Sequence, residues 1–123
     1  MSVSSTGSLE ASEAASAAVA VAPRVALADI EAAIAYEYSF TAGRAIVAMQ
    51  MRVTPQTPDP LDILTVCILV MKNGFTVIGK SAPASPSNFN AALGYKFARE
   101  DAIRQLWPLM GYALRDKLHN ATP

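Results

Sequence analysis

The side chains that could take part in chemistry are concentrated in the second half of the chain, where basic and aromatic residues are interleaved. The basic residues are Lys80, Lys96, Arg99, Arg104, Arg115 and Lys117, and the aromatic residues are Tyr95, Phe97 and Trp107. Basic side chains contact phosphates, and aromatic rings can stack on bases. The pattern is compatible with nucleic-acid binding, but solvated charges beside core aromatics are the simpler interpretation.

Arg99 is the residue in this group that departs most from its surroundings. Helical spacing places it inside an apolar arc with Tyr95, Ala98 and Ala102. An arginine in such an arc either extends past its neighbours to solvent or reaches a carboxylate or an anionic ligand in a pocket. We therefore take Arg99, Lys80, Lys96, Trp107 and Tyr95 as the candidate residues for binding a ligand or partner.

The sequence contains no recognisable catalytic constellation. Glu100 and Asp101 are adjacent, so on a helix their side chains point about 100° apart and cannot form a facing pair. His119 is the only histidine and Cys67 the only cysteine, which excludes an internal disulfide and a zinc site of soft ligands. We expect Cys67 to be a core residue, and we expect a protein without enzymatic activity, metal or cofactor.

Composition limits the classes of partner. Ten basic and ten acidic residues cancel, so no net charge attracts the chain to nucleic acid or to an anionic membrane. The apolar run from Ile63 to Met71 is far shorter than the roughly 20 residues that span a bilayer, and no basic residue precedes the Ala/Val stretch near 14–22. We expect a cytoplasmic protein with no membrane contact.

The apolar residues are unevenly distributed, and this predicts the domain organisation. Residues 1–23 are almost entirely Ala, Ser, Val and Glu, which predicts a low-complexity tail that is either disordered or a frayed helix. Residues 24–120 contain enough large apolar side chains for a single globular domain.

A β-hairpin over residues 62–80 is the predicted centre of the fold. Asn73-Gly74 suits the positive φ values of a type I′ turn, which would place Lys72 opposite Phe75 and Leu69 opposite Ile78. The first strand, Ile63 to Met71, is apolar on both faces, so we expect it to be the central strand, covered on both sides.

The segments before the hairpin are predicted to supply a helix and a third strand. Leu27, Ile30 and Ile34 recur at helical spacing, which predicts a short helix over residues 26–36 that is broken at 41–43. Period-two alternation over residues 46–53 favours a third strand, with a helix as the alternative. The prolines in residues 54–60 predict a loop.

The segment after the hairpin is predicted to be helical. Ser85-Pro86 has the composition of an N-cap followed by a first-turn proline, and we expect a long helix to about Trp107. Pro108 should kink it, and residues 109–118 should continue as a separate helix. The expected fold is α+β: a small antiparallel sheet packed by a short N-terminal helix and a long, proline-kinked C-terminal helix.

Phe89, Leu93 and Phe97 recur every four residues on that helix. Their ridge lies outside the arc assigned to the sheet, so either the same chain covers it or a second subunit does. We predict a homo-oligomer, a dimer or higher, through this ridge.

Several short segments together resemble a family of small phage proteins, named after gene product forty-nine of an N-four-type podovirus and gene sixty-six of a Shigella phage. The resemblance covers residues 24–118 and rests on Lys72–Ser81, Asn88–Asn90 with Gly94, Ala98–Ala102, Trp107–Leu109 with Gly111-Tyr112, and the opening helix. The chain differs from the usual family pattern in its Ala/Ser tail and in residues 41–60.

The resemblance implies a bacteriophage accessory protein in the cytoplasm of the infected bacterium, with no established reaction. The function that we expect is anti-defence binding: blocking or sequestering a host component, either a defence protein or a small signalling nucleotide. The alternative is a nucleic-acid-binding accessory protein, and an enzyme is the least expected class.

Overall fold

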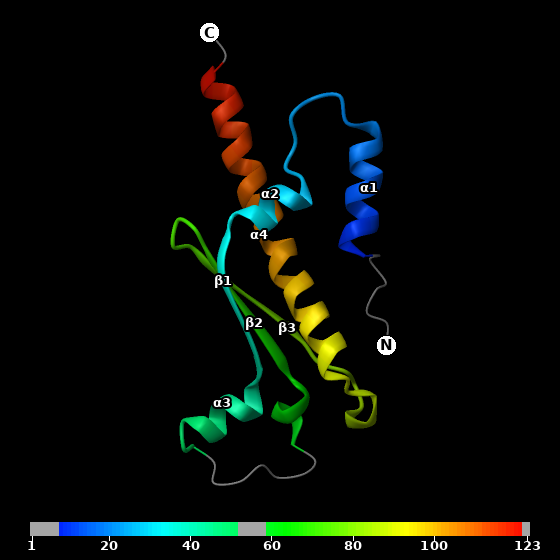
Figure 1. The fold of residues 1–123 in the computed structure, drawn as a ribbon, viewed down its shortest axis with the longest axis vertical. Helices are drawn as coiled ribbons and strands as arrows, with labels where there is room; N and C mark the ends of the chain where they lie inside the picture. Colours follow the sequence, from blue (N-terminus) through cyan, green and yellow to red (C-terminus); the bar gives the residue numbers. More distant parts are fainter. Residues whose placement is uncertain (1–7, 52–58, 122–123) are drawn as a thin grey trace.

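The computed structural model describes residues 8–51 and 59–121, which form an α+β fold (Figure 1). In chain order the elements are α1 (Leu9–Val19), α2 (Leu27–Ala32), β1 (Ile34–Thr41), α3 (Ala42–Ala48), the 3₁₀ helix η1 (Pro60–Ile63), β2 (Thr65–Met71), β3 (Thr76–Ser81), the 3₁₀ helix η2 (Pro86–Asn88) and α4 (Ala91–Ala121). Within this part of the chain, no helix combines the length and apolar character needed to cross a membrane.

The three strands form an antiparallel sheet in the order β1-β2-β3, so β2 is the central strand, as predicted. Helix α4 lies along one face of the sheet, α2 lies near the hairpin end, and α3 with η1 lies at the opposite end (Figure 1). Burial along β2 alternates strictly between buried and half-buried residues. The described helices therefore fully cover only one face of the sheet. We expected both faces to be covered, by helices or by a partner chain.

The predicted hairpin is present, but its register differs by one residue from the prediction. Met71 N–H donates to Phe75 O (2.8 Å) and Gly74 N–H to Met71 O (2.9 Å). The structure describes all three loop residues, Lys72, Asn73 and Gly74, and among them only Gly74 has a positive φ (89°). This is a type I turn followed by a glycine bulge, not a type I′ turn. Leu69 consequently faces Val77 instead of Ile78.

The first strand of the sheet occupies a segment that we predicted to be partly helical. Helix α2 ends at Ala32, and β1 (Ile34–Thr41) pairs with β2 from end to end, with one irregularity in register between Ile34 and Tyr36. Tyr36, Tyr38 and Phe40 alternate along the strand, and aromatic residues fit a pleated surface better than a helix. Thr41 ends this strand, so no helix is broken there.

The third strand predicted over residues 46–53 is wrong. Residues 42–48 form helix α3, and residues 52–58 lie outside the described residues, together with most of the predicted 54–60 loop. The Thr41 side chain caps α3 by accepting a hydrogen bond from Arg44 N–H (3.4 Å), and the alanines that follow favour a helix.

The C-terminal helix begins later and continues further than predicted. Residues 86–88 form η2, while α4 begins at Ala91, where Asn90 Oδ1 accepts from Leu93 N–H (3.0 Å). Pro108 lies inside one continuous helix that runs to Ala121, so the predicted separate helix over 109–118 is wrong. Leu106 and Met110 pack on the same core on either side of the proline, which keeps both halves in one helix.

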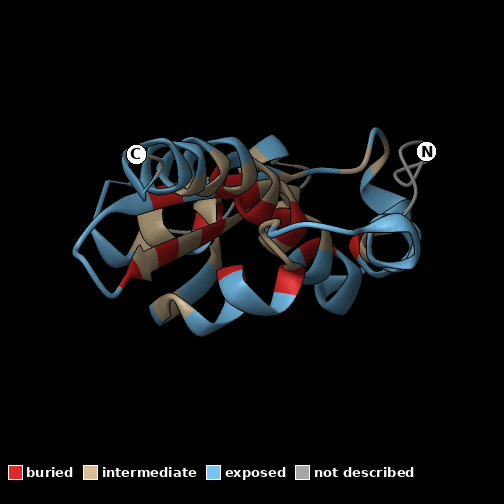
Figure 2. Ribbon diagram, turned by 90° about the horizontal axis from the view of Figure 1, so that it is seen from above, coloured by how far each residue is buried: buried red, intermediate tan, exposed pale blue. Residues whose placement is uncertain are grey.

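Glycines and alanines allow α4 to lie unusually close to the sheet. A Cβ atom on Gly79 would lie 2.0 Å from Ala98 O and 2.5 Å from Ala102 N. Around this contact are the large buried side chains Leu69 and Ile103, and Figure 2 shows the buried residues gathered between α4 and the strands. Cys67 is fully buried in the same layer, as expected for a core residue.

Residues 9–19 form a helix that contacts the rest of the chain. Leu9 is buried, and Glu13 pairs with Arg24 (2.6 Å) and accepts from Leu27 N–H (3.2 Å). The hydrogen bond from Arg24 lowers the pKa of Glu13 to about 2, so this contact is lost only in strong acid. That residues 24–120 fold as a domain without residues 1–23 stays a prediction.

Candidate functional site

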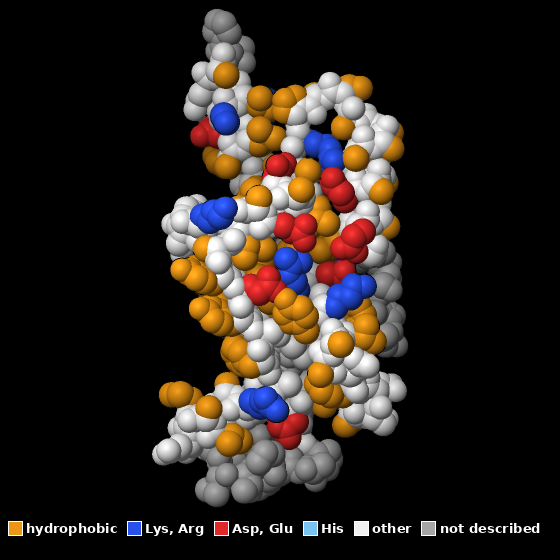
Figure 3. Space-filling model, viewed as in Figure 1, with side chains coloured by type: hydrophobic (Ala, Val, Ile, Leu, Met, Phe, Trp, Pro, Cys, Tyr) orange, Lys and Arg blue, Asp and Glu red, His pale blue; other side chains and the backbone are white. Residues whose placement is uncertain are grey.

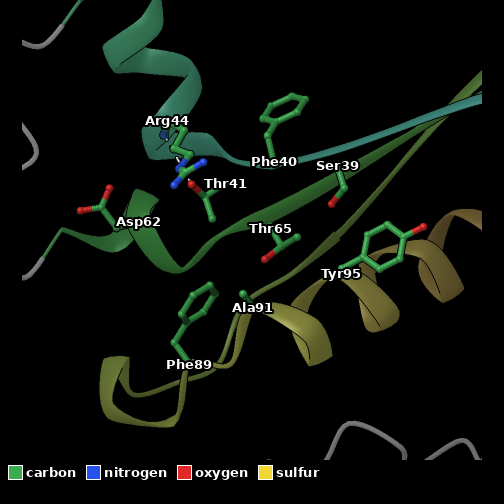
Figure 4. Close-up of a pocket in the computed structure, with 9 residues that line it drawn as sticks. All are labelled: Ser39, Phe40, Thr41, Arg44, Asp62, Thr65, Phe89, Ala91 and Tyr95. Carbon is green, nitrogen blue, oxygen red and sulfur yellow. Dashed lines mark hydrogen bonds between the residues drawn. The ribbon is translucent and has the colours of Figure 1, made fainter.

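The pocket of most chemical interest lies where β1, α3 and the beginning of α4 meet (Figure 4). It is an open hollow of about 630 Å³, within the range of small-molecule sites. The side chains that give it chemical character are Ser39, Thr41, Arg44, Asp62, Phe89 and Tyr95, together with Thr65. Phe40 also borders the pocket, but its ring lies on the other side of β1.

Local structure determines where Arg44 lies. Because Thr41 caps α3, Arg44 is held in the first turn of this helix, at the mouth of the pocket. In Figure 4 its guanidinium group points toward Thr41, and the Asp62 carboxylate is turned away from the pocket. Among residues 8–51 and 59–121, the Arg44 side chain has no hydrogen-bond or ion-pair partner. It is a cation available to an anionic group.

Thr65 supplies a second unsatisfied group. Its side chain lies in the lining of the pocket, the residue is only 4% exposed, and Oγ1 has no hydrogen-bond partner within the part of the chain that the structure describes. Gly94 allows this arrangement, since a Cβ atom there would lie 2.6 Å from Thr65 Oγ1. A buried hydroxyl left unpaired costs about 1–3 kcal/mol. A ligand atom that bonded to it would recover part of that free energy.

Arg99 differs from Arg44 because its charge is already neutralised. Its Nε lies 3.1 Å from the Glu37 carboxylate and its Nη1 lies 3.4 Å from Glu31 Oε2. Burial lowers the pKa of Arg99, but the hydrogen bonds that it donates to Glu37 and Glu31, together with the negative charges of these carboxylates, outweigh burial and raise the pKa above its ordinary value. Of the two predicted alternatives, extension to solvent or contact with a carboxylate or an anionic ligand, the structure shows contact with carboxylates. Figure 3 shows acidic and basic side chains side by side on this face.

Tyr95 connects this ion-pair cluster with the pocket. Its hydroxyl donates a hydrogen bond to Glu37, the same carboxylate that pairs with Arg99, while its ring borders the pocket. Figure 4 shows the hydroxyl turned away from the pocket. The shared contacts with Glu37 therefore hold the Tyr95 ring in position at the edge of the pocket. Arg99 does not line the pocket and acts on it only through Glu37 and Tyr95.

The other predicted binding residues lie apart from this site. Lys80 is an exposed residue of β3 whose backbone N–H donates to Asp101 Oδ2 (2.9 Å). The Lys96 ammonium lies 6.0 Å from the Phe97 ring centroid. Trp107 is half-buried, and its indole N–H donates to Val25 O (3.0 Å). Of the five predicted residues, the structure brings only Arg99 and Tyr95 together, and a binding role for any of them stays a prediction.

The carboxylates that we considered for catalysis do not form a pair. Glu100 is buried and its Oε2 has no partner within the described residues, whereas Asp101 binds the backbone of β3. In the described part of the chain, no three His, Cys, Asp or Glu residues lie close enough together to hold a metal ion. Burial raises the pKa of the Cys67 thiol to about 11, and Glu37 adds to this effect. The thiol is therefore protonated at neutral pH.

The Phe89, Leu93 and Phe97 ridge forms one side of a second hollow, with the 81–84 segment of the same chain as the other side. Leu93 is exposed, while Phe89 and Phe97 are half-buried. Part of this ridge is thus covered within the chain, and an oligomer interface there stays a prediction.

Sequence reasoning missed Arg44 and Thr65. Arg44 lies between the break predicted at residues 41–43 and the strand predicted over residues 46–53, so neither prediction included it. The signal that could have found it is Thr41 followed by Ala42–Ala48, a capping residue before a helix-forming run. No sequence signal indicated that the Thr65 hydroxyl would be buried without a partner.

Comparison with known proteins identifies a family. The profile of a family described as phage protein (N4 Gp49/phage Sf6 gene 66) matches residues 25–118. No curated protein and no solved structure matches the chain significantly.

Proposed function

Because the chain belongs to the phage protein (N4 Gp49/phage Sf6 gene 66) family, we propose that it is a phage accessory protein that sequesters a small signalling nucleotide of its host. The observation that carries the proposal is a pocket that contains a cation, Arg44, and a buried hydroxyl, Thr65, neither of which has a side-chain partner within the described residues. A nucleotide would meet the protein in the cytoplasm of the infected bacterium.

The residues of the pocket match the parts of a nucleotide. The Arg44 guanidinium has the planar, charged donor geometry that binds phosphate oxygens in pairs. The Phe89 ring points into the pocket and offers a face for a base. Asp62 also borders the pocket, and its negative charge would repel a second phosphate. The ligand class that fits is a molecule with one anionic and one polar, uncharged end.

We propose binding without turnover. The pocket contains one carboxylate, Asp62, together with Arg44 and hydroxyl groups, and none of these side chains is arranged with a base that could activate it. A protein that blocks a signal needs only to hold the nucleotide more tightly than the host receptor does. A host defence protein as the target is an alternative with no specific contact to support it.

Nucleic-acid binding is the weaker alternative. That hypothesis required exposed aromatics beside free cations, but Trp107 is held by Val25 and Arg99 is neutralised by two carboxylates. Of the remaining basic candidates, Lys80 lies on β3, while Lys96, Arg104, Arg115 and Lys117 lie on α4, where Glu100, Asp101 and Asp116 are interspersed among them. Without a continuous basic surface, the phosphate contacts that give nucleic-acid affinity are few.

Calorimetric titration tests the proposal with a panel of mononucleotides, nucleoside triphosphates and cyclic mono- and dinucleotides. We expect a saturable, stoichiometric interaction with at least one member. Arg44→Gln should weaken it about tenfold or more, since a hydrogen bond to a charged group contributes about 1.5–3 kcal/mol. Arg115→Gln, which changes an exposed arginine of α4, is the matched control and should not alter the affinity.

Thr65→Val separates binding from folding. Removing an unpaired buried hydroxyl should leave the free energy of unfolding unchanged or raise it, while the affinity for the nucleotide falls. Chromatography of the ligand after incubation detects turnover. No binding by any member of the panel at millimolar concentration, or equal affinity in Arg44→Gln, would refute the proposal.

A further inference from the structure

The side of the sheet that faces away from α4 carries an apolar surface. Strand pairing places the residues of this surface in three rows across the strands: Tyr36, Val70 and Thr76; Tyr38, Ile68 and Ile78; Phe40, Val66 and Lys80. We call these nine residues the open face. Lys80 is the only charged residue among them, and it lies at one corner.

No described helix lies across the open face. Tyr36, Tyr38 and Ile78 are 63%, 56% and 57% exposed, although all three are central residues of their strands. Figure 1 shows α4 on the opposite side of the sheet, and Figure 3 shows hydrophobic side chains along the edge of the molecule beside β1. An antiparallel sheet in a monomer usually presents polar residues to water on such a side.

From this arrangement we propose that the open face is the interface of a homodimer, in which the sheets of two copies pack face to face. Sheets pack in this way about 10 Å apart, with their strands rotated by about 30°. The inference is independent of the nucleotide proposal. It also differs from the predicted oligomer through Phe89, Leu93 and Phe97.

The charge pattern of the open face supports a second copy as the occupant. If the two-fold axis runs parallel to the strands, β1 of one copy lies over β3 of the other, and Lys80 meets Phe40. If the axis runs across the strands, each strand lies over its own copy, and Lys80 meets Thr76. In neither arrangement does Lys80 face itself, so the one charge on the face does not oppose association. With the axis parallel to the strands, Lys80 would also lie over an aromatic ring.

The area is sufficient for a dimer. A large aromatic side chain carries about 150–250 Å² of surface, so Tyr36, Tyr38 and Ile78 together expose roughly 350 Å² in each copy. The half-buried Phe40, Val66, Ile68 and Val70 add to this. Two copies would therefore bury more than the roughly 1,000 Å² that a specific interface requires.

Analytical ultracentrifugation of the full chain tests the proposal. We expect a dimer at micromolar concentration, with a dissociation constant that rises at least tenfold in Tyr38→Lys and in Ile78→Glu. Both positions are more than half exposed, so neither change disturbs the core. The control is Tyr112→Glu on α4, an exposed aromatic residue on another surface, which should leave the dimer intact.

Mixing the two variants gives a sharper test. When either variant pairs with itself, the new charge meets its own copy if the axis runs across the strands, and it is buried against Ile78 or Tyr38 of the other copy if the axis runs parallel to them. In a mixed pair with the axis parallel to the strands, the new lysine lies over the new glutamate. An equimolar mixture of Tyr38→Lys and Ile78→Glu should therefore recover a heterodimer, which mass labelling of one chain identifies. A chain that stays monomeric at high micromolar concentration would overturn the proposal. So would a dimer that survives both variants but dissociates in Phe97→Asp.

Discussion

The two faces of the sheet are built from alternate residues of the same three strands, yet they differ in almost every property. The face toward α4 contains Cys67, Leu69 and Val77, all buried, and a glycine, Gly79, at the point of closest approach. The open face contains aromatic and branched residues that stay half-buried or exposed. The difference shows that hydrophobic residues alone do not bring a helix onto a sheet.

Small residues decide which face α4 covers. Gly79 lies against Ala98 and Ala102, and Gly94 lies against Thr65, so the helix backbone approaches the strands at two points. On the open face, Ile68 and Ile78 face each other at the centre, where a helix could not come as close. Burial of apolar surface favours both contacts, but only the α4 face lets a helix pack at native density.

The largest expected effect is on the α4 face, in Gly79→Ala. The added methyl group would overlap the backbone at Ala98 and Ala102, and a helix backbone cannot move aside as a flexible side chain can. We expect the free energy of unfolding, measured by urea denaturation, to fall by about 3 kcal/mol, the upper end of typical overpacking costs. Gly111→Ala is the control, because no heavy atom lies within 4 Å of its Cβ position. It should gain about 1 kcal/mol from helix propensity.

The ion pairs of Arg99 on α4 give the second-largest expected effect on stability. Arg99→Met would remove the hydrogen bonds to Glu37 and leave that carboxylate half-buried without its cation. We expect a loss of about 1.5–3 kcal/mol in the free energy of unfolding, the contribution of hydrogen bonds to charged groups. Arg115→Met, on the exposed part of α4, should change it by less than about 0.5 kcal/mol. An unchanged melting temperature in Arg99→Met would show that the cluster does not stabilise the fold.

Substitutions at two neighbouring residues of β3, Val77 and Ile78, compare the α4 face with the open face directly. Val77→Thr places a hydroxyl group in the buried layer and should cost about 1–3 kcal/mol of unfolding free energy. Ile78→Thr makes a related change on the open face and should cost no more than about 0.5 kcal/mol in an isolated subunit. Both are best measured by thermal unfolding in a Tyr38→Lys background, which removes the proposed dimer. Equal effects would contradict the assignment of the two faces.

The last effect concerns Cys67 and appears only at alkaline pH. Burial raises its pKa from 9.0 to about 11, so the unfolded chain loses this proton before the folded chain does. The resulting contribution to stability is complete below pH 9 and is lost as the pH rises toward 11. A shallow fall in melting temperature over that interval, absent in Cys67→Ala, is the expected result. At pH 8, iodoacetamide should modify the thiol only in denaturant, and rapid modification of the folded protein would contradict its burial.

The sequence alone determined the parts of the fold that depend on neighbouring residues. Gly74 permits a positive φ, so a hairpin forms there, and the apolar run before it becomes the central strand. The same reasoning gave an α+β fold with a long C-terminal helix. The alternation of Ile34, Tyr36, Tyr38 and Phe40 was also a local signal for β1, but the helical spacing that begins at Leu27 was extended too far.

Tertiary structure decided what depends on distant pairing. The hairpin register follows from the glycine bulge and from which residues the helix covers, and a shift of one residue changes every cross-strand pair. Arg99 and Glu37 are 62 residues apart in sequence, so no local pattern could indicate that they bind. The pocket likewise needs β1, β2, α3 and α4 together before Arg44 of α3 and Thr65 of β2 share one space. Local preferences act over a few residues, whereas these contacts exist only after the chain has folded, because packing brings their partners together.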